Sequence, residues 1–186
     1  MVIAAFDVHY LGDDRASAAA VLLSDYGDAE PAAVYTQFFP GAASYVSGEF
    51  YRRELPVILA LLEEMDKALD EIVVDGYVKI GDRPGLGQHL FDSLGGKIAV
   101  IGVAKSEFKG ASGIVVFRGS SARPLYVTSA GLEQEKAGER IKRMHGDYRI
   151  PAMLKLADRL ARGNARSHGF ISTVRGRLSG KEIIHG

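Results

Sequence analysis

Cysteine is absent from this 186-residue chain, and its apolar runs are short. The first absence excludes disulfides, thiolate zinc sites and cysteine nucleophiles. The second excludes a membrane span, which needs roughly 18 apolar residues. The opening stretch also lacks a basic leader and meets an aspartate early, so no signal peptide is expected. We therefore expect a soluble, cytoplasmic protein with no membrane partner.

An excess of either charge is also missing, because 23 basic residues balance 23 acidic ones. A nucleic-acid partner would therefore have to be held by a local patch rather than by the molecule as a whole. Hydrophobic residues make up 47% of the chain, which is ordinary for a globular domain with its own core. We expect one domain over residues 1–162 and a basic, flexible C-terminal extension over residues 163–186.

Apolar patterns predict a mixed sheet flanked by helices, which is the α/β class. Three N-terminal runs separated by turns predict a meander, and the run KIAVIGVAKS predicts a central, parallel strand. A first helix that begins near Leu55 would hold Pro56 in its first turn, whereas an earlier start would imply a kink. The predicted strands are 2–8, 17–24, 33–39, 72–75, 97–106, 114–117 and 125–128. The predicted helices are one within 49–71, whose apolar face runs from Phe50 to Leu69, and those at 85–94, 132–145 and 152–161.

Two aspartates interrupt or end apolar strands. Asp7 lies inside the first run, where a buried charge is costly unless it is paired or bound to a metal, and Asp75 ends a later run. Sites in open α/β sheets lie outside the strand ends, so these aspartates meet if their strands are neighbours, with Glu54 of the first helix leaning over the same edge. Three carboxylates without thiols suit Mg²⁺ or Mn²⁺. Lys105, at another strand end, would neutralise charge on a phosphate.

Each of these residues also has a structural interpretation. An aspartate at a strand end, such as Asp75, is more often a turn or cap residue than a ligand. Glu54 alone would be a solvated helix residue, and Lys105 alone a surface lysine. For Asp7 the structural and functional interpretations have equal weight. Composition and spacing therefore reach only an α/β domain with a candidate metal site.

Six stretches follow one another along most of residues 1–161: FDVHY, YVSGEFYRRELP, VVDGYVKIGDRPGLGQHL, IGVAKS, PLYVTSAG and DYRIPAMLKLADRLAR. Together they resemble the endonuclease V family, nucleases that cut near deaminated bases, inosine above all. The matching family features are, in the same order, a first-strand aspartate, a tyrosine wedge followed by a helix glutamate, a long loop with aspartate, glycine and histidine, a strand-end lysine, a late strand and the last helix.

The resemblance implies a ribonuclease H-like fold and a Mg²⁺ or Mn²⁺ ion held by Asp7, Glu54 and Asp75. It also implies that water attacks a phosphodiester of DNA or RNA close to a deaminated nucleotide, with Lys105 near the phosphate. A DNA repair role would follow. The oligomeric state is left open, with a monomer favoured.

The same resemblance implies residues that bind the substrate. Tyr45 would fill the space left when the lesion base turns into a pocket, and that extrusion costs less for a weakly pairing hypoxanthine. Gly48 and Gly76 would let backbone amides approach the base. Arg83 matches an arginine of the family's long loop.

The chain departs from the family at both histidines that the resemblance leads us to expect. The loop histidine is missing from the stretch GDR at 81–83, and the second is replaced by Gly131 or Leu132. Serines also stand in place of the prolines on either side of Tyr45. We therefore predict a divergent member whose activity is reduced or altered.

Other groups are candidates to replace the lost histidines. Residues 7 and 9 share a face if the first strand reaches His9, which makes His9 the first candidate. Lys79 and Asp82 of the altered loop are further candidates. His89 matches a less critical family histidine, and we expect it to be structural.

Two other functions remain open. One is a catalytically weak nucleic-acid-binding module on the same fold, which would use the basic tail and Arg52, Arg53, Arg83 and Lys109. The other is an unrelated role on the ribonuclease H-like fold.

Overall fold

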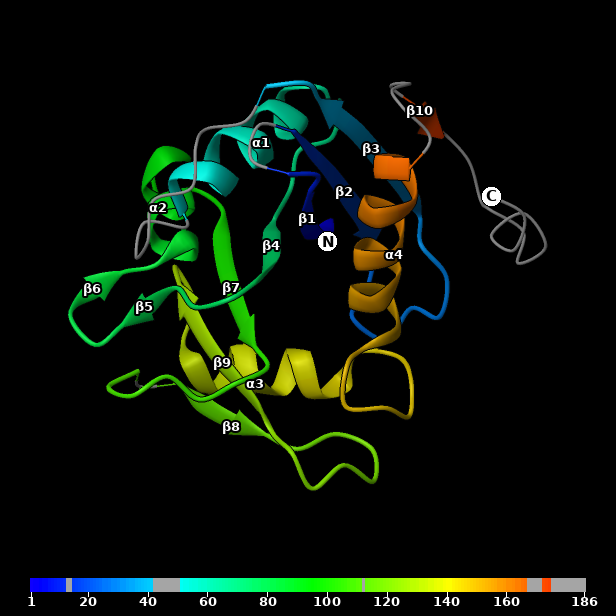
Figure 1. Cartoon of the computed structure of the whole chain (residues 1–186). Coiled ribbons are helices and arrows are strands. Elements are labelled where there is room, and N and C mark those ends of the chain that lie inside the picture. Colours follow the sequence, from blue (N-terminus) through cyan, green and yellow to red (C-terminus); the bar gives the residue numbers. More distant parts are fainter. Residues whose placement is uncertain (13–14, 42–50, 112, 167–171, 175–186) are drawn as a thin grey trace.

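A single mixed sheet runs through the computed structural model, which describes residues 1–12, 15–41, 51–111, 113–166 and 172–174 (Figure 1). The sheet has eight strands in the order β10-β3-β2-β1-β4-β7-β9-β8, and β5 pairs separately with β6. The strands are β1 (Ile3–Tyr10), β2 (Ala16–Leu23), β3 (Ala33–Phe39), β4 (Glu71–Asp75), β5 (Lys79–Ile80), β6 (Arg83–Pro84), β7 (Ala99–Ala104), β8 (Ile114–Val116), β9 (Leu125–Ala130) and β10 (Ser172–Val174). The helices are α1 (Tyr51–Glu63), α2 (Leu86–Ser93), α3 (Gln134–Arg143) and α4 (Ala152–Arg166).

The first strand, β1, lies inside the sheet between β2 and β4. It runs antiparallel to β2 and parallel to β4, and β4 is in turn parallel to β7. Strands β1 to β3 form the antiparallel meander predicted from the sequence. Strand β7 is central and parallel to β4, as predicted, but antiparallel to β9 on its other side. The α/β class with a mixed sheet is therefore confirmed.

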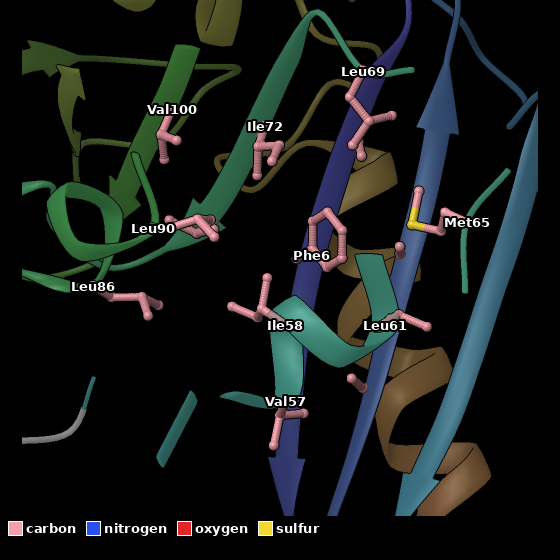
Figure 2. Packing of buried hydrophobic residues seen from close by; sticks show 14 of the residues in the cluster. Phe6, Val57, Ile58, Leu61, Met65, Leu69, Ile72, Leu86, Leu90 and Val100 are labelled. Atoms are coloured by element: carbon pink, nitrogen blue, oxygen red, sulfur yellow. The ribbon is translucent and has the colours of Figure 1, made fainter. Parts of the chain in front are cut away.

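Two hydrophobic cores lie on opposite faces of the sheet. Side chains alternate along β1, so Ala4 and Phe6 pack on the face covered by α1 and α2. Ile3 and Ala5 pack on the other face, which α3 and α4 cover (Figure 1). Figure 2 shows Ile58 of α1 next to Phe6 in the first core. The strand that carries Asp7 is therefore held from both sides.

The first helix takes the earlier of the two starts that the sequence left open. It already includes Tyr51, so Pro56 lies within the helix rather than in a first turn that begins near Leu55. The helix ends at Glu63, before the last apolar residue of the predicted pattern. That residue, Leu69, packs in the first core from the segment after the helix. A loop residue can thus continue the apolar pattern of a helix, because the loop residue and the helix bury their side chains in the same core.

The segment after residue 162 contains regular structure. Helix α4 continues to Arg166, and β10 pairs antiparallel with β3 at the edge of the sheet. The division of the chain at residue 162 stays a prediction. No helix among the described residues is both long and apolar enough to cross a bilayer.

Candidate active site

Strand β4 ends at Asp75 because the backbone turns sharply at the next residue. Gly76 has a φ of +118°, a conformation that residues with a Cβ rarely adopt. The chain then crosses close to β7, where a Cβ on Gly102 would lie 2.6 Å from the Gly76 carbonyl oxygen. The Thr128 hydroxyl accepts a hydrogen bond from the Val78 N–H at 2.8 Å and fixes this crossing. Two glycines and a threonine therefore hold Asp75 at the edge of the sheet.

Asp7 lies at the same edge as Asp75. The parallel ladder between β1 and β4 pairs Phe6 with Val74, so each strand presents its aspartate at the next position. Lys105 directly follows β7, the neighbour of β4, and its Nζ lies 2.5 Å from Asp75 Oδ2. Three adjacent parallel strands thus bring two carboxylates and one ammonium group together.

A pocket of about 450 Å³ opens at this edge, and Glu54 of α1 lines it together with Asp7, Asp75 and Lys105. Glu54 is only 7% exposed. It is therefore not the solvated helix residue that its position alone suggested. Helix α1 packs on the sheet through the first core, and this packing points its buried face, including Glu54, toward the strand ends.

Helix α4 adds a fourth carboxylate that the sequence analysis did not single out. Asp158 lines the pocket with Arg162, whose Nε lies 2.8 Å from Asp158 Oδ1. The signal in the sequence is weak: an aspartate directly follows Leu156 and Ala157, which belong to the buried face of the helix. Only the packing of α4 over β1 and β2 brings it to the pocket.

The acids of this site lack enough positive charge around them. We call the space lined by Asp7, Glu54, Asp75 and Asp158 the carboxylate pocket. Burial raises the pKa of Asp7 from 3.8 to about 7, and the negative charges of Asp158 and Asp75 act in the same direction. Burial, followed by the charges of Asp7 and Asp75, also raises the pKa of Glu54 well above its usual value. The neighbouring lysine and arginines act against these shifts without cancelling them.

The donor set of the carboxylate pocket suits a hard divalent cation. Carboxylate oxygens are the ligands that Mg²⁺ and Mn²⁺ prefer, and the raised pKa values indicate negative charge that a cation would compensate. Within the part of the chain that the structure describes, no three acidic or imidazole side chains stand close enough together to hold a metal ion. Mg²⁺ does not need such a closed group, because it usually keeps several waters and binds one or two carboxylates. The residues present therefore fit such an ion.

The remaining predicted site residues divide into three groups. His9 and Gly76 line the carboxylate pocket, and β1 extends to Tyr10, so residues 7 and 9 share a face of the strand. Arg83 of β6 is exposed and does not line the pocket. Lys79 of β5 and Asp82, which lies between β5 and β6, are also exposed and do not line it. Tyr45, the predicted wedge, and Gly48, predicted to let a backbone amide approach the base, fall outside the described residues. Their roles stay predictions.

Two other candidates have structural surroundings. Arg53 is buried, with its guanidinium 4.0 Å from the centre of the Tyr10 ring and 3.4 Å from the Gly12 carbonyl oxygen. Its proposed part in a basic binding surface is therefore wrong. His89 stacks on Tyr51 with ring centroids 3.7 Å apart, which joins α2 to α1. A structural role for His89 agrees with this stacking.

The second missing histidine does not belong to this pocket. Gly131 follows Ala130, which pairs with Val100 near the start of β7, whereas Lys105 follows the end of that strand. The two ends of a six-residue strand are about 17 Å apart. Gly131 also has a φ of +74°, and a Cβ there would lie 2.6 Å from the Phe91 ring. Leu132, the other position considered, is the next residue and packs against the second core. The absence of a histidine at either position therefore takes no side chain from the carboxylate pocket, which corrects the expectation from the sequence.

The sheet order and the carboxylates at its edge define a class of protein. A five-stranded unit of three meandering strands followed by two parallel strands, with helices on both faces, is the ribonuclease H-like fold. A model of one family within this class, described as Endonuclease V, matches residues 1–159. The chain belongs to the endonuclease V family, a family of nucleases.

Relatives and solved structures agree with this assignment. The chain is 28% identical over 181 residues to an endonuclease V of Trichormus variabilis, and the match covers 86% of this chain and 81% of that protein. It is similar to the structure of endonuclease V from Streptomyces avermitilis, with a TM-score of 0.72, 26% identity and coverage of 90% of this chain and 82% of the other. A structure of Ciona intestinalis endonuclease V, in complex with a 24mer DNA containing an inosine followed by a ribo-adenosine, has a TM-score of 0.78 at 19% identity, over 90% and 87% of the two chains.

Proposed function

We propose that this protein is a metal-dependent endonuclease that cleaves phosphodiester bonds of DNA or RNA. The observation that carries the proposal is the carboxylate pocket, where acids from β1, β4, α1 and α4 line one space. Burial and the neighbouring negative charges raise the pKa values of Asp7 and Glu54 there. Asp7, Glu54 and Asp75 would hold Mg²⁺ or Mn²⁺. When bound, such an ion supplies an activated water and stabilises charge on the leaving oxygen.

The chain's own residues would orient the phosphodiester. Lys105 already points its ammonium group at the pocket, where it pairs with Asp75. A phosphate beside Asp75 would therefore meet a positive group that offsets the charge developing on its oxygens. Tyr77 supports this arrangement: its hydroxyl donates to the Ser106 carbonyl at 2.7 Å and accepts from the Phe108 N–H at 3.1 Å. Tyr77 thereby joins the segment after Asp75 to the segment after Lys105.

We further propose that the substrate is nucleic acid with a deaminated base such as inosine. The family supports this proposal, as does the inosine-containing DNA bound by the Ciona protein. Tyr45 would act as the wedge, and Gly48 and Gly76 would let backbone amides approach the extruded base. His9 lines the pocket beside Asp7 and is the residue we propose for proton transfer in place of the missing loop histidine.

Cleavage of labelled oligonucleotides tests this function. Single- and double-stranded DNA and RNA, with and without one inosine, would be incubated in Mn²⁺ and in EDTA with the wild-type protein and with Asp75→Asn. We expect Mn²⁺-dependent cutting near inosine that Asp75→Asn lowers by about 10³-fold or more, as when a group that stabilises transition-state charge is removed. Glu135→Gln, an exposed acid of α3 away from the pocket, is the matched control.

The outcomes separate the parts of the proposal. Cutting without preference for inosine would keep the nuclease and discard the repair role. Equal activity of Asp75→Asn and the wild-type protein would refute the carboxylate pocket as the catalytic site. A folded protein that cuts none of these substrates would favour the alternative function, a nucleic-acid-binding module.

A further inference from the structure

A row of basic side chains follows the exposed face of α4. Lys155, Arg159 and Arg162 are all exposed, and their spacing of four and three residues places them on one side of the helix. The row is about 10 Å long, from the rise of a helix over seven residues. The opposite side of the helix, with Leu156 and Ala157, is buried against the sheet. We call these three residues the basic row.

The basic row passes directly beside the carboxylate pocket. Arg162 lines that pocket. Lys155 lines a second, smaller pocket of about 140 Å³, which shares Asp7, Asp75 and Asp158 with the first. Two pockets therefore meet at the carboxylates, and the basic row contributes a side chain to each of them.

An exposed aromatic ring continues the row at its N-terminal end. Tyr148 is 71% exposed, and Lys155 Nζ lies 4.1 Å from the centre of its ring. The backbone at this point is fixed, because Arg118 Nη1 donates to the Tyr148 carbonyl at 2.9 Å. The next residue, Arg149, donates through its guanidinium to the Pro124 carbonyl at 2.6 Å. A firmly held backbone thus presents an aromatic face to solvent beside a lysine.

We propose that Tyr148, Lys155 and Arg159 bind a single-stranded stretch of nucleic acid that runs into or out of the carboxylate pocket. Successive phosphates would lie along the basic row, and a base would stack on Tyr148. This inference rests on the proposed function, because the pocket supplies the reason for a strand to lie there. The chain has no net charge, so the attraction must come from such a local patch.

The charges of the row support this assignment. Arg162 is paired with Asp158. Neither Lys155 nor Arg159 forms an ion pair with another described residue. Their positive charge therefore remains to attract phosphate. An aromatic ring next to unpaired basic groups is the combination that binds single strands without a sequence requirement.

The test is equilibrium binding in EDTA, which removes the metal that the proposed cleavage requires and so leaves binding alone to be measured. A fluorescein-labelled single strand of about 16 nucleotides, as DNA and as RNA, would be titrated by anisotropy over about 50–200 mM salt. The variants are Lys155→Gln/Arg159→Gln, Tyr148→Ala and Tyr148→Phe. The matched control is Lys136→Gln/Lys142→Gln, which removes the same charge from α3, where neither residue lines either of the two pockets described above.

The two kinds of variant have different expected signatures. Each phosphate contact on a single strand contributes about 0.7 to the slope of log affinity against log salt, so the double charge variant is expected to reduce that slope by about 1.4. Tyr148→Ala is expected to weaken binding about tenfold with an unchanged slope, while Tyr148→Phe keeps the ring and the affinity. The α3 control is expected to match the wild-type protein, and DNA and RNA arms show which backbone is preferred.

The outcomes distinguish this inference from the proposed nuclease. A slope that is the same in the wild-type protein, the charge variant and the α3 control would overturn the binding surface, even if the protein cuts DNA or RNA in Mn²⁺. The predicted slopes in a protein that never cuts would uphold the surface and refute the nuclease. Absence of any binding by the wild-type protein in EDTA would overturn the binding surface, and cleavage in Mn²⁺ would still decide the nuclease.

Discussion

The two ends of β4 each carry a carboxylate network, and the networks differ in how the charge is compensated. At the start of the strand, Glu71 is 6% exposed and accepts a hydrogen bond from the Tyr26 hydroxyl at 2.5 Å. It also forms an ion pair with Arg140 of α3. At the other end, the carboxylate pocket places several acidic side chains close to one another. Burial, and then the negative charges of Asp158 and Asp75, raise the pKa of Asp7 to about 7.

This difference separates structure from function within one strand. A buried carboxylate with a hydrogen-bond donor and a cation is satisfied and needs nothing from outside the chain. A buried carboxylate with a raised pKa carries a poorly compensated charge, which either a proton or a bound cation can offset. The Glu71 network therefore joins β4 to α3, whereas the carboxylate pocket leaves negative charge that the proposed cation would compensate. Four predictions test this comparison.

Asp7→Asn is expected to have the largest effect and to separate activity from stability. The cleavage rate in Mn²⁺ should fall by about 10³-fold or more, because a cation ligand is lost. The metal-free protein should become more stable at pH 8, because a poorly compensated buried charge is removed. Single-turnover cleavage and urea unfolding in EDTA measure the two effects. A variant that is inactive and also less stable than the wild-type protein would contradict the comparison.

Arg140→Ala should have the opposite pattern. It leaves Glu71 buried without its cation, which is expected to lower the free energy of unfolding by about 3 kcal/mol. The affinity for Mn²⁺, measured by calorimetry on the folded variant, should not change. Arg143→Ala is the control, because Arg143 pairs with Asp25 on the surface at 2.9 Å, and such exposed pairs contribute less than about 1 kcal/mol. Equal losses in the two variants would show that the Glu71 network is not a special anchor.

The stability of the metal-free protein should depend on pH through Asp7. Its pKa is about 7 in the folded protein and 3.8 when exposed, so the folded state binds more protons between these values. The contribution of Asp7 to the free energy of unfolding is therefore most favourable below about pH 4, and it is lost as the pH rises to about 7. We expect the free energy of unfolding to fall by an amount on the order of 2 kcal/mol. This is less than the full shift of the Asp7 pKa implies, because Asp7 is only partly buried and water screens its charge.

Urea unfolding in EDTA at pH 5 and pH 8 measures this dependence, and the difference between the wild-type protein and Asp7→Asn isolates it from other titrating groups. The same difference at both pH values would show that Asp7 is not the group responsible. Added Mn²⁺ should reduce the loss at pH 8, since a cation compensates the ionised carboxylate.

Tyr26→Phe is expected to have the smallest effect. It removes the hydrogen bond to Glu71 but leaves Arg140 in place, which should cost about 1.5 kcal/mol, the value for a bond to a charged group. A double-mutant cycle of Tyr26→Phe with Arg140→Ala should show non-additive losses, because both side chains act on one carboxylate. Additive losses would mean that the two contacts stabilise the fold separately.

Much of the fold followed from local patterns. The strands of the meander and the apolar run of β7 were predictable because buried strands have continuous or alternating apolar residues. The ends of α1 were not predictable: Leu69 continues the helical pattern, yet it belongs to the segment after the helix because it packs in the same core. Helix ends depend on such packing as well as on periodicity.

For the site, the sequence by itself determined which functional groups are available: no thiols, a carboxylate inside the first strand and another at the end of β4. Only the tertiary structure decided which groups meet. It brought Asp158 from the last helix to Asp7, buried Arg53 under Tyr10, and set Gly131 at the opposite end of the sheet from Lys105. The physical reason is that sequence spacing places residues only along one element, whereas strand pairing and helix packing join elements far apart in the chain.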